Sequence, residues 1–365
     1  MLNLFEAFAG IGAWGKALKR ENVKFELVGF SEINKYAISA FCAIHNQSEC
    51  KNYGDITKID SHNLPQIDLL CASPPCQSFS IAGKQKGMED DRGKLFLDTL
   101  RIVTFAKPKV ILFENVKGLT FKKFEPELTY ILSYLKGMGY NVYHKILDAK
   151  DFGIPQSRKR LFIVGIKGVF DDGSFTFPEV MPLQISLMDL LEENVPDKYY
   201  IKDKCLIYWN KTKDTQIKKG FSSLDSDVAV CQTARQYANW RGNYVTDKKL
   251  HCIGLINNQN SQGMRVYEKN ISCTLSSQGG GYGAKTGLYK EGDRVRKLTP
   301  LECMRLMNFD DEDFDKLKSL NLSDTQLYRL CGNSIVVSVI CAIIKNLKQI
   351  LGGIENGTKN NSKID

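Results

Sequence analysis

Residues 2–18 read LNLFEAFAGIGAWGKAL, an apolar run followed by a glycine turn and a helix-like segment. Gly10 and Gly12 permit the tight turn that joins a strand to the helix after it. Apolar strands and amphipathic segments continue to alternate through residue 166. The expected strands are Leu2–Phe5, Leu27–Phe30, Ile67–Cys71, Val110–Phe113, Val142–Leu147 and Leu161–Ile166, and the expected helices include Lys35–His45, Leu95–Phe105 and Glu127–Lys136. This alternation predicts an α/β fold with a doubly wound, mainly parallel sheet.

The composition narrows the class of protein. The 365 residues are 43% hydrophobic and 25% charged, which excludes wholesale disorder and fibrous structure. No apolar run is expected to reach the roughly 18 residues of a membrane helix, and the N-terminus does not resemble a signal peptide. We therefore expect a cytoplasmic protein. The 11 cysteines form no Cys-x-x-Cys pair, so no metal site is expected, and the net charge of +9 is compatible with a nucleic-acid partner.

The domain organisation is expected to be discontinuous. Periodicity fades in the middle of the chain, where polar residues rise and a glycine-rich stretch appears at Gly279–Gly283. A final apolar helix is predicted over Ile335–Leu351, opened by Asn333 and Ser334 and stopped by Gly352–Gly353. We predict a large domain of residues 1–171 plus 295–353, an inserted, irregular, mainly β domain of residues 172–294 and a disordered tail of residues 354–365.

The glycine turn and Glu32 follow expected strands at their carboxyl ends, and a second carboxylate, Asp55, stands in the segment Gly54–Ile56. The turn Phe8–Gly12 lacks the third glycine of the dinucleotide fingerprint, so a plain turn explains it equally well. Glu32 is placed to accept hydrogen bonds from ribose hydroxyls, and Asp55 to accept one from an exocyclic amine. Each carboxylate is equally compatible with an ordinary loop residue.

The stretch at residues 73–80, SPPCQSFS, is more specific. Pro74 and Pro75 fix the backbone directly before Cys76, at a strand end where α/β enzymes place their sites. A thiol held there is a nucleophile once it is deprotonated. A buried structural role suits Cys71 better than Cys76.

Two further polar elements border expected strands. Glu114 and Asn115 follow an apolar strand, and the cluster Gln156–Arg160 precedes another. Such a charged cluster alone is typical of a solvated face. Beside a nucleophilic cysteine and a strand-end carboxylate, it favours an element that contacts an anion and a base.

With these motifs in this order, the sequence resembles the cytosine-C5 DNA methyltransferases, and within them the small bacterial restriction-modification enzymes that methylate GCGC. The resemblance extends to Arg92–Leu95, Arg296–Pro300 and Gly332–Ser334. It implies a Rossmann-like catalytic domain that binds S-adenosyl-L-methionine (AdoMet) and a smaller domain that recognises double-stranded DNA. The residues that it implies for the cofactor are Phe8, Gly10, Gly12, Glu32, Ile33, Asp55, Ile56, Pro75, Leu95 and Asn333; those for catalysis are Cys76, Glu114, Asn115, Arg158 and Arg160.

Two departures limit what the resemblance implies. Ile33 stands where family members often carry a tryptophan that stacks on adenine, and Gln278 stands where GCGC-type enzymes carry tyrosine. The sequence preference of those enzymes is therefore not transferred to this chain.

The chemistry of cytosine assigns the expected roles. C5 becomes nucleophilic only after a thiolate adds at C6, which we expect Cys76 to supply. Protonated Glu114 is expected to serve N3, with Asn115 positioning its loop, and Arg158 and Arg160 to hold the O2 edge and a nearby phosphate. A base inside a duplex is inaccessible to these groups, so the cytosine must flip out.

The expected DNA contacts lie in two loops. Residues 79–94 are interpreted as a lid with Lys84, Lys86 and Arg92 on phosphates, although a plain surface loop has the same composition. Gln262 is the candidate to fill the emptied position, and Arg265 to read a guanine. The other expected contacts are Thr274, Ser276, Gln278 and Gly281; a glycine-rich hairpin with a solvated arginine is the alternative.

Three other functions are weighed against this one. A tRNA cytosine-C5 methyltransferase would have a smaller target domain than the long interval between Arg160 and Arg296 suggests. A catalytically silent DNA-binding regulator is disfavoured by Cys76 and Glu114, and a nicotinamide-dependent oxidoreductase leaves both unexplained. We expect a monomer acting on a short GC-containing palindrome, with a restriction endonuclease as an optional functional partner.

Overall fold

The computed structural model describes residues 1–75, 91–199, 227–232 and 298–361, and the backbone of five short strands between residues 222 and 289. The chain divides into two compact units. Unit 1 comprises Met1–Asp148, Lys159–Val180 and Ile335–Asp365, and unit 2 comprises Ala149–Arg158 and Met181–Ser334.

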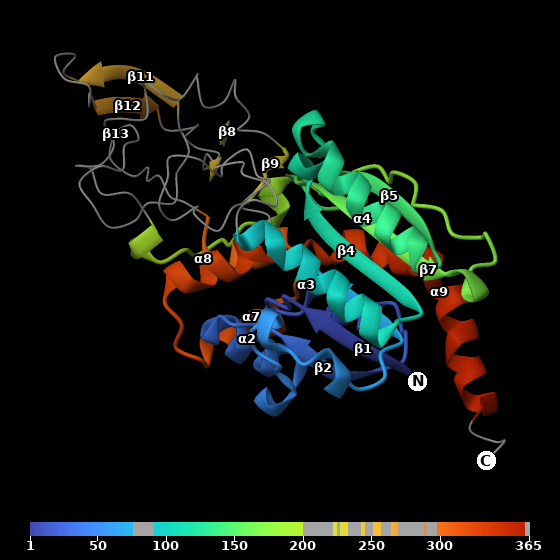
Figure 1. Ribbon diagram of the computed structural model, residues 1–365. Helices are drawn as coiled ribbons and strands as arrows, with labels where there is room; N and C mark the ends of the chain where they lie inside the picture. Colours follow the sequence, from blue (N-terminus) through green and yellow to red (C-terminus); the bar gives the residue numbers. More distant parts are fainter. Residues whose placement is uncertain are drawn as a thin grey trace. The chain divides into compact units, whose positions relative to one another are not determined.

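Unit 1 is built on a six-stranded sheet of order β2-β1-β3-β4-β7-β5 (Figure 1). Strands β1 to β4 are parallel, whereas β7 runs antiparallel to both of its neighbours. The strands are β1 Leu2–Ala7, β2 Phe25–Ser31, β3 Leu69–Ala72, β4 Val110–Val116, β5 Tyr140–Asp148 and β7 Lys159–Lys167. Each expected strand is present, and the predicted doubly wound α/β fold is confirmed.

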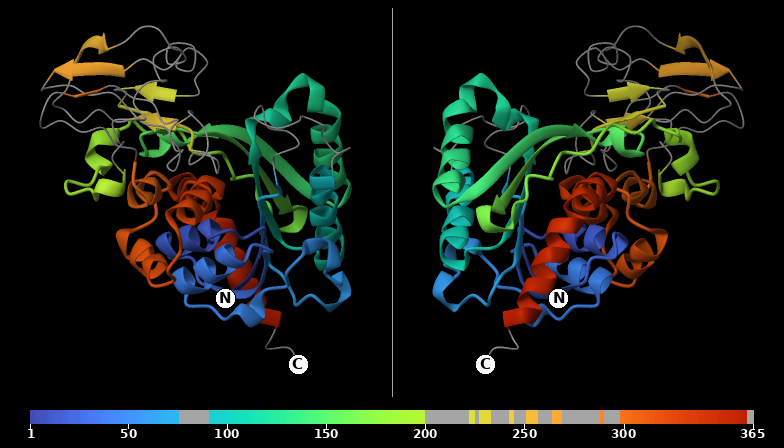
Figure 2. Two further views of the ribbon diagram at one scale, coloured as in Figure 1. Left: turned by 90° about the vertical axis from the view of Figure 1, so that its left-hand side faces the viewer. Right: turned by 90° about the vertical axis from the view of Figure 1, so that its right-hand side faces the viewer.

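Helices cover both faces of this sheet. Figure 2 shows α3 and α4 on one face and α1 and α9 on the other. Thr104 of α3 and Tyr134 of α4 share a 2.7 Å hydrogen bond, while Trp14 of α1 packs edge-on against Phe162 of β7. The helices are α1 Ala13–Arg20, α2 Lys35–His45, α3 Asp91–Ala106, α4 Glu125–Gly137 and α9 Val337–Asn361.

The C-terminal helix differs from its prediction at both ends. Asn333 ends the preceding helix and Ser334 caps it, so α9 begins only at Val337. The predicted stop at Gly352–Gly353 is wrong, because the helix continues to Asn361. Ile354 is buried beyond the glycines, and the Glu355 carboxylate lies 3.7 Å from the N-terminal amine. These contacts offset the low helix propensity of glycine, so residues 354–361 are helical rather than disordered.

One stretch passes a membrane test that we expected the chain to fail. Asp324–Glu355 has a window of mean hydropathy 1.9 with the length of a membrane span. However, 72% of that window is buried inside the protein. A long apolar helix that is mostly buried in this way is typical of a globular core.

In its described residues, unit 2 combines short strands with three capped helices. Its helices α6 Pro300–Leu306, α7 Asp311–Lys318 and α8 Asp324–Asn333 each begin with a capping box. Its strands are β6 Gln156–Ser157, β8 Ser222–Leu224, β9 Ala229–Val230, β10 Gly242–Tyr244, β11 His251–Ile256, β12 Met264–Glu268 and β13 Leu288–Tyr289. The strands after residue 222 give this part of the chain its expected β character.

The two units do not coincide with the two predicted domains. Residues 298–334, which we grouped with the large domain, pack within unit 2. The Glu302 carboxylate accepts a hydrogen bond from the backbone N–H of Glu192 (2.9 Å), and Gln156 donates its side-chain amide to the carbonyl of Leu306 (2.7 Å). Hydrophobic periodicity reports only local structure, so it could not predict these long-range hydrogen bonds.

Candidate active site

The glycine turn follows β1 at the carboxyl edge of the sheet. Phe8, Gly10 and Gly12 all have a positive φ, of 54°, 56° and 77°. A Cβ atom on Gly12 would lie 2.2 Å from Nε2 of the buried His45, whereas a Cβ on Gly10 would meet no atom of the described residues within 4 Å. Gly12 is therefore required for packing, and Gly10 leaves space above the turn for a ligand.

Glu32 lies next to this turn, directly after β2. Its Oε2 accepts a hydrogen bond from the backbone N–H of Gly10 (3.0 Å), and its Oε1 accepts from those of Ile33 (2.9 Å) and Asn34 (2.8 Å). The carboxylate is thereby fixed beside the turn by backbone donors. Ile33 itself is 75% exposed, so an apolar side chain stands at the rim of the site.

Asn52 is a site residue that the sequence reasoning missed. Its side-chain oxygen accepts from the backbone N–H of Glu32 (3.1 Å) and of Gly54 (3.0 Å), and its side-chain nitrogen donates to the carbonyl of Glu32 (3.0 Å). It thus connects the end of β2 to the turn that carries Asp55. Asparagine and glycine are both common in turns, so nothing in the sequence distinguishes this asparagine.

A pair of oppositely charged side chains lies near the end of β4. Arg160 of β7 places its Nε 3.0 Å from Oε1 of Glu114. Glu114 lies opposite Phe162 in the antiparallel ladder, so Arg160 is its diagonal neighbour on the same face. The two side chains are only 11% and 16% exposed, so the ion pair is largely withdrawn from water.

Asn115 ties this strand to the loop that leads to the candidate nucleophile. Its side-chain nitrogen donates to the carbonyl of Pro74 (3.3 Å), and its side-chain oxygen accepts from the backbone N–H of Val116 (2.9 Å). On the other side of the loop, Trp14 donates its indole N–H to the hydroxyl of Ser73 (3.2 Å). The backbone at Ser73 and Pro74, shortly before Cys76, is therefore held by two side chains.

A family model described as C-5 cytosine-specific DNA methylase matches residues 2–349. The chain belongs to this family. The resemblance noted in the sequence is thereby confirmed, and with it the enzyme class and AdoMet as the methyl donor.

The methylase has relatives in bacteria and phages. It is 33% identical to the orphan methyltransferase M.SPRI of Bacillus phage SPR, over 95% of this chain and 97% of the relative. It is also 33% identical to the type II methyltransferase M.HhaI of Haemophilus parahaemolyticus, over 95% of this chain and 94% of the relative. Among solved structures, the methyltransferase EhMeth of Entamoeba histolytica shares the fold, with a TM-score of 0.67 and 20% identity over 96% of this chain and 99% of that one.

The carboxyl edge of the sheet in this methylase fits its cofactor. AdoMet presents ribose hydroxyls and an exocyclic amine as donors, and the edge supplies carboxylate acceptors at Glu32 and Asp55. Space above Gly10 and the exposed Ile33 suit close approach of an apolar ring.

Arg158 differs from its expected role at the cytosine. It is 4% exposed, and within unit 2 its guanidinium donates to the carbonyls of Gln232 (2.6 Å), Gly332 (3.1 Å) and Ser334 (2.6 Å). Backbone carbonyls from distant parts of the chain thus occupy the donors that we had assigned to the substrate. We infer that Arg158 stabilises unit 2.

Cys71 behaves as the structural cysteine that we expected. It is fully buried in β3, and burial raises the pKa of its thiol well above the usual value. A thiolate is therefore strongly disfavoured at this position.

The remaining predicted residues divide by how far the structure describes them. Pro75 and the half-buried Leu95 of α3 lie in unit 1, and Asn333 ends α8 in unit 2. For Arg92 and Arg265 only the backbone is described. Outside the described residues lie Cys76, Lys84, Lys86, Gln262, Thr274, Ser276, Gln278 and Gly281.

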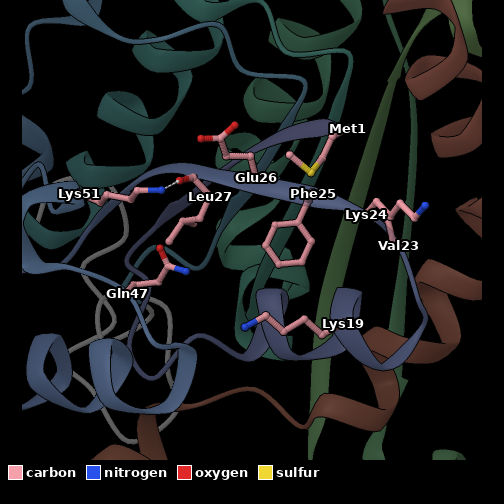
Figure 3. Close-up of a pocket in the computed structure, with 9 residues that line it drawn as sticks. All are labelled: Met1, Lys19, Val23, Lys24, Phe25, Glu26, Leu27, Gln47 and Lys51. Atoms are coloured by element: carbon pink, nitrogen blue, oxygen red, sulfur yellow. Dashed lines mark hydrogen bonds between the residues drawn. The ribbon is translucent and has the colours of Figure 1, made fainter. Parts of the chain in front are cut away.

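A surface pocket occurs at the opposite edge of the sheet, where β1 and β2 begin (Figure 3). It is lined by Met1, Lys19, Val23, Lys24, Phe25, Glu26, Leu27, Gln47 and Lys51. One of its lysines, Lys51, donates to the carbonyl of Leu27 (2.7 Å). None of the predicted site residues lines this pocket, so we do not assign it to methyl transfer.

Glu6 is an unexpected buried carboxyl group beneath the glycine turn. It is 1% exposed, and its Oε1 accepts from the backbone N–H of Gly15 (3.0 Å). Its Oε2 accepts no hydrogen bond from the described part of the chain. Burial raises the pKa of Glu6 to about 8, with smaller opposing contributions from Gly15 and Lys19. The side chain is thus a neutral acid at neutral pH.

This pKa predicts how stability depends on pH. The folded protein holds the Glu6 proton up to about pH 8, whereas the unfolded chain releases it near the ordinary pKa of 4.5. Between these values the free energy of unfolding falls as pH rises, by on the order of 1 kcal/mol per unit. Urea denaturation of Glu6→Gln should show that its free energy of unfolding declines less from pH 5 to pH 8 than that of the wild type. The difference in stability between variant and wild type should therefore shift in favour of the variant as the pH rises. Exposed Glu26→Gln is the control and should keep the wild-type slope; an unchanged slope in Glu6→Gln would refute the assignment.

Proposed function

We propose that this enzyme methylates C5 of a flipped-out cytosine within a short, specific sequence of double-stranded DNA, through a covalent bond between Cys76 and C6. The observation that carries the proposal is the Glu114–Arg160 pair, because it places an acid and a cation at the end of β4. Asn115 connects this strand end to the carbonyl of Pro74, two residues before Cys76.

The chemistry assigns one role to each of these residues. The Cys76 thiolate adds to C6. This addition raises the electron density at N3, and Glu114 donates a proton to N3 in compensation. Arg160 keeps the Glu114 carboxyl oriented and would donate to O2 of the base when the cytosine is bound. Bound AdoMet supplies an electrophilic methyl group. Once the methyl group is on C5 and S-adenosylhomocysteine is left as the by-product, loss of the C5 proton to a base would expel the Cys76 thiolate. N3 would return its proton to Glu114 as the ring regains aromaticity.

The cofactor contacts are proposed from the geometry of the sheet edge. Glu32 would accept from the ribose hydroxyls and Asp55 from the exocyclic amine of adenine, while Gly10 admits the ligand to the turn. Ile33 would cover the adenine by apolar contact in place of aromatic stacking.

DNA recognition is assigned to the loops named in the sequence analysis. Lys84, Lys86 and Arg92 would contact phosphates, Gln262 would enter the vacated stack, and Arg265 of β12 would read a guanine. We further propose a monomer in the bacterial cytoplasm. The relatives include orphan phage methyltransferases and type II enzymes, so a partner endonuclease is an option rather than a requirement.

Transfer of labelled methyl groups to different nucleic acids tests this function. The protein is expected to label unmethylated duplex DNA and to leave tRNA unlabelled. Cys76→Ser should abolish labelling but retain binding of the cofactor product S-adenosylhomocysteine, because the thiolate acts only on the base. Labelling of tRNA alone would contradict the substrate, and near-normal activity of Cys76→Ser would contradict the nucleophile.

A further inference from the structure

The turn that carries Asp55 is held by one peptide group. Asp55 caps a single 3-10 turn, Ile56–Lys58, and its Oδ1 accepts from both the backbone N–H (3.0 Å) and the hydroxyl (2.9 Å) of Thr57. These hydrogen bonds lower the pKa of Asp55. Its Oδ2 accepts no hydrogen bond from the described residues and is therefore available to a ligand.

Arg101 of α3 donates a hydrogen bond to the same peptide group. The N–H of Thr57 and the carbonyl of Ile56 belong to one planar unit, and the Nη2 of Arg101 donates to that carbonyl (2.7 Å). Rotating this peptide would break the Arg101 contact and the Asp55 contact together. A cation on the carbonyl also polarises the N–H toward the carboxylate.

The remaining donors of Arg101 fix the guanidinium itself. Nη1 donates to the carbonyl of Ile59 (2.7 Å) and the hydroxyl of Ser61 (2.5 Å), while Nε and Nη2 face Oδ1 of Asp98 at 3.4 and 3.2 Å. All five N–H donors of the guanidinium are thus used. Arg101 belongs to the same helix as Leu95, so this helix and the Asp55 turn are joined through one side chain.

We propose that Arg101 is the positioning residue for adenine selectivity: it fixes the Ile56–Thr57 peptide, which holds Oδ1 of Asp55 and leaves Oδ2 aimed at the exocyclic amine. The inference rests on the proposed role of Asp55 as the adenine contact. A ligand with a carbonyl in place of that amine would face the carboxylate with an acceptor and bind more weakly.

Calorimetry with two ligands tests the proposal on the full chain without DNA. S-adenosylhomocysteine is compared with S-inosylhomocysteine, which differs by that one exchange of amine for carbonyl. Wild type should prefer the adenine compound at least tenfold. Arg101→Ala and Arg101→Lys should lose most of this preference, approaching the ratio of Asp55→Asn, since neither can grip the carbonyls of both Ile56 and Ile59.

Ser61→Ala is the matched control. It removes one hydrogen bond of Arg101 but leaves the Ile56 contact, so the preference should stay at the wild-type value. If the Arg101 variants bound both ligands more weakly by the same factor, Arg101 would have a purely structural role and the proposal would be overturned. A wild type without preference would overturn the Asp55 contact as well, while leaving methyl transfer to DNA as a separate result.

Discussion

Replacing Glu114 by glutamine is expected to lower methyl transfer by about 10²- to 10⁴-fold, the usual contribution of a general acid. The amide has the shape of the carboxyl group and can still accept from Arg160, so the 3.0 Å contact at the end of β4 is retained. It has no proton to transfer to N3. The loss should therefore appear in the rate of transfer from a saturated complex, measured by single-turnover labelling of DNA.

The control for Glu114→Gln is Glu125→Gln at the exposed start of α4. This substitution makes the same change of charge away from the candidate site and should transfer methyl at the wild-type rate. Binding of S-adenosylhomocysteine should be unchanged in both variants. A Glu114→Gln rate within threefold of wild type would remove Glu114 from the chemistry.

Alanine substitutions at the two turn glycines are expected to separate packing from ligand binding. Both residues have a positive φ, which costs an alanine about 1–2 kcal/mol. Only at Gly12 would the new Cβ overlap His45, whose Nε2 lies 3.1 Å from the carbonyl of Ile11. Displacing that buried ring adds an overpacking cost of about 1–3 kcal/mol.

Gly12→Ala should therefore lower the free energy of unfolding by roughly 3 kcal/mol, measured by urea denaturation. Gly10→Ala should cost only about 1 kcal/mol of stability, because its Cβ enters open space. It should nevertheless lower the affinity for S-adenosylhomocysteine at least tenfold, since we place the ligand in that space. Equal stability of the two variants would contradict the packing argument, and undiminished affinity in Gly10→Ala would contradict the ligand position.

The fold was predictable because its signals are local. Apolar runs such as Val110–Phe113 are buried on both faces of a mainly parallel sheet, and helix α2 has the predicted bounds. Carboxyl groups at strand ends were recognisable as candidates for the same reason: parallel strands bring their carboxyl ends to one edge. Glu32 and Glu114 became candidates in this way.

What the sequence did not predict depends on contacts between distant residues. The partners of Arg158 lie at residues 232, 332 and 334, so its structural role has no local signal. The alternation of side chains along β1 is compatible with an inward position for Glu6. It does not predict that a carboxyl group is buried there. Helix α9 passes two glycines because Ile354 finds a buried position, which only tertiary packing reveals.

Sequencing the genome of a bacterial host that lacks cytosine methylation, after expression of this protein, tests the central claim most directly. Methylation of cytosine C5 confined to one short motif, and absent when Cys76→Ser is expressed, is the predicted result. An unmethylated genome, from cells that contain folded protein able to bind S-adenosylhomocysteine, would contradict the assignment of DNA as the substrate.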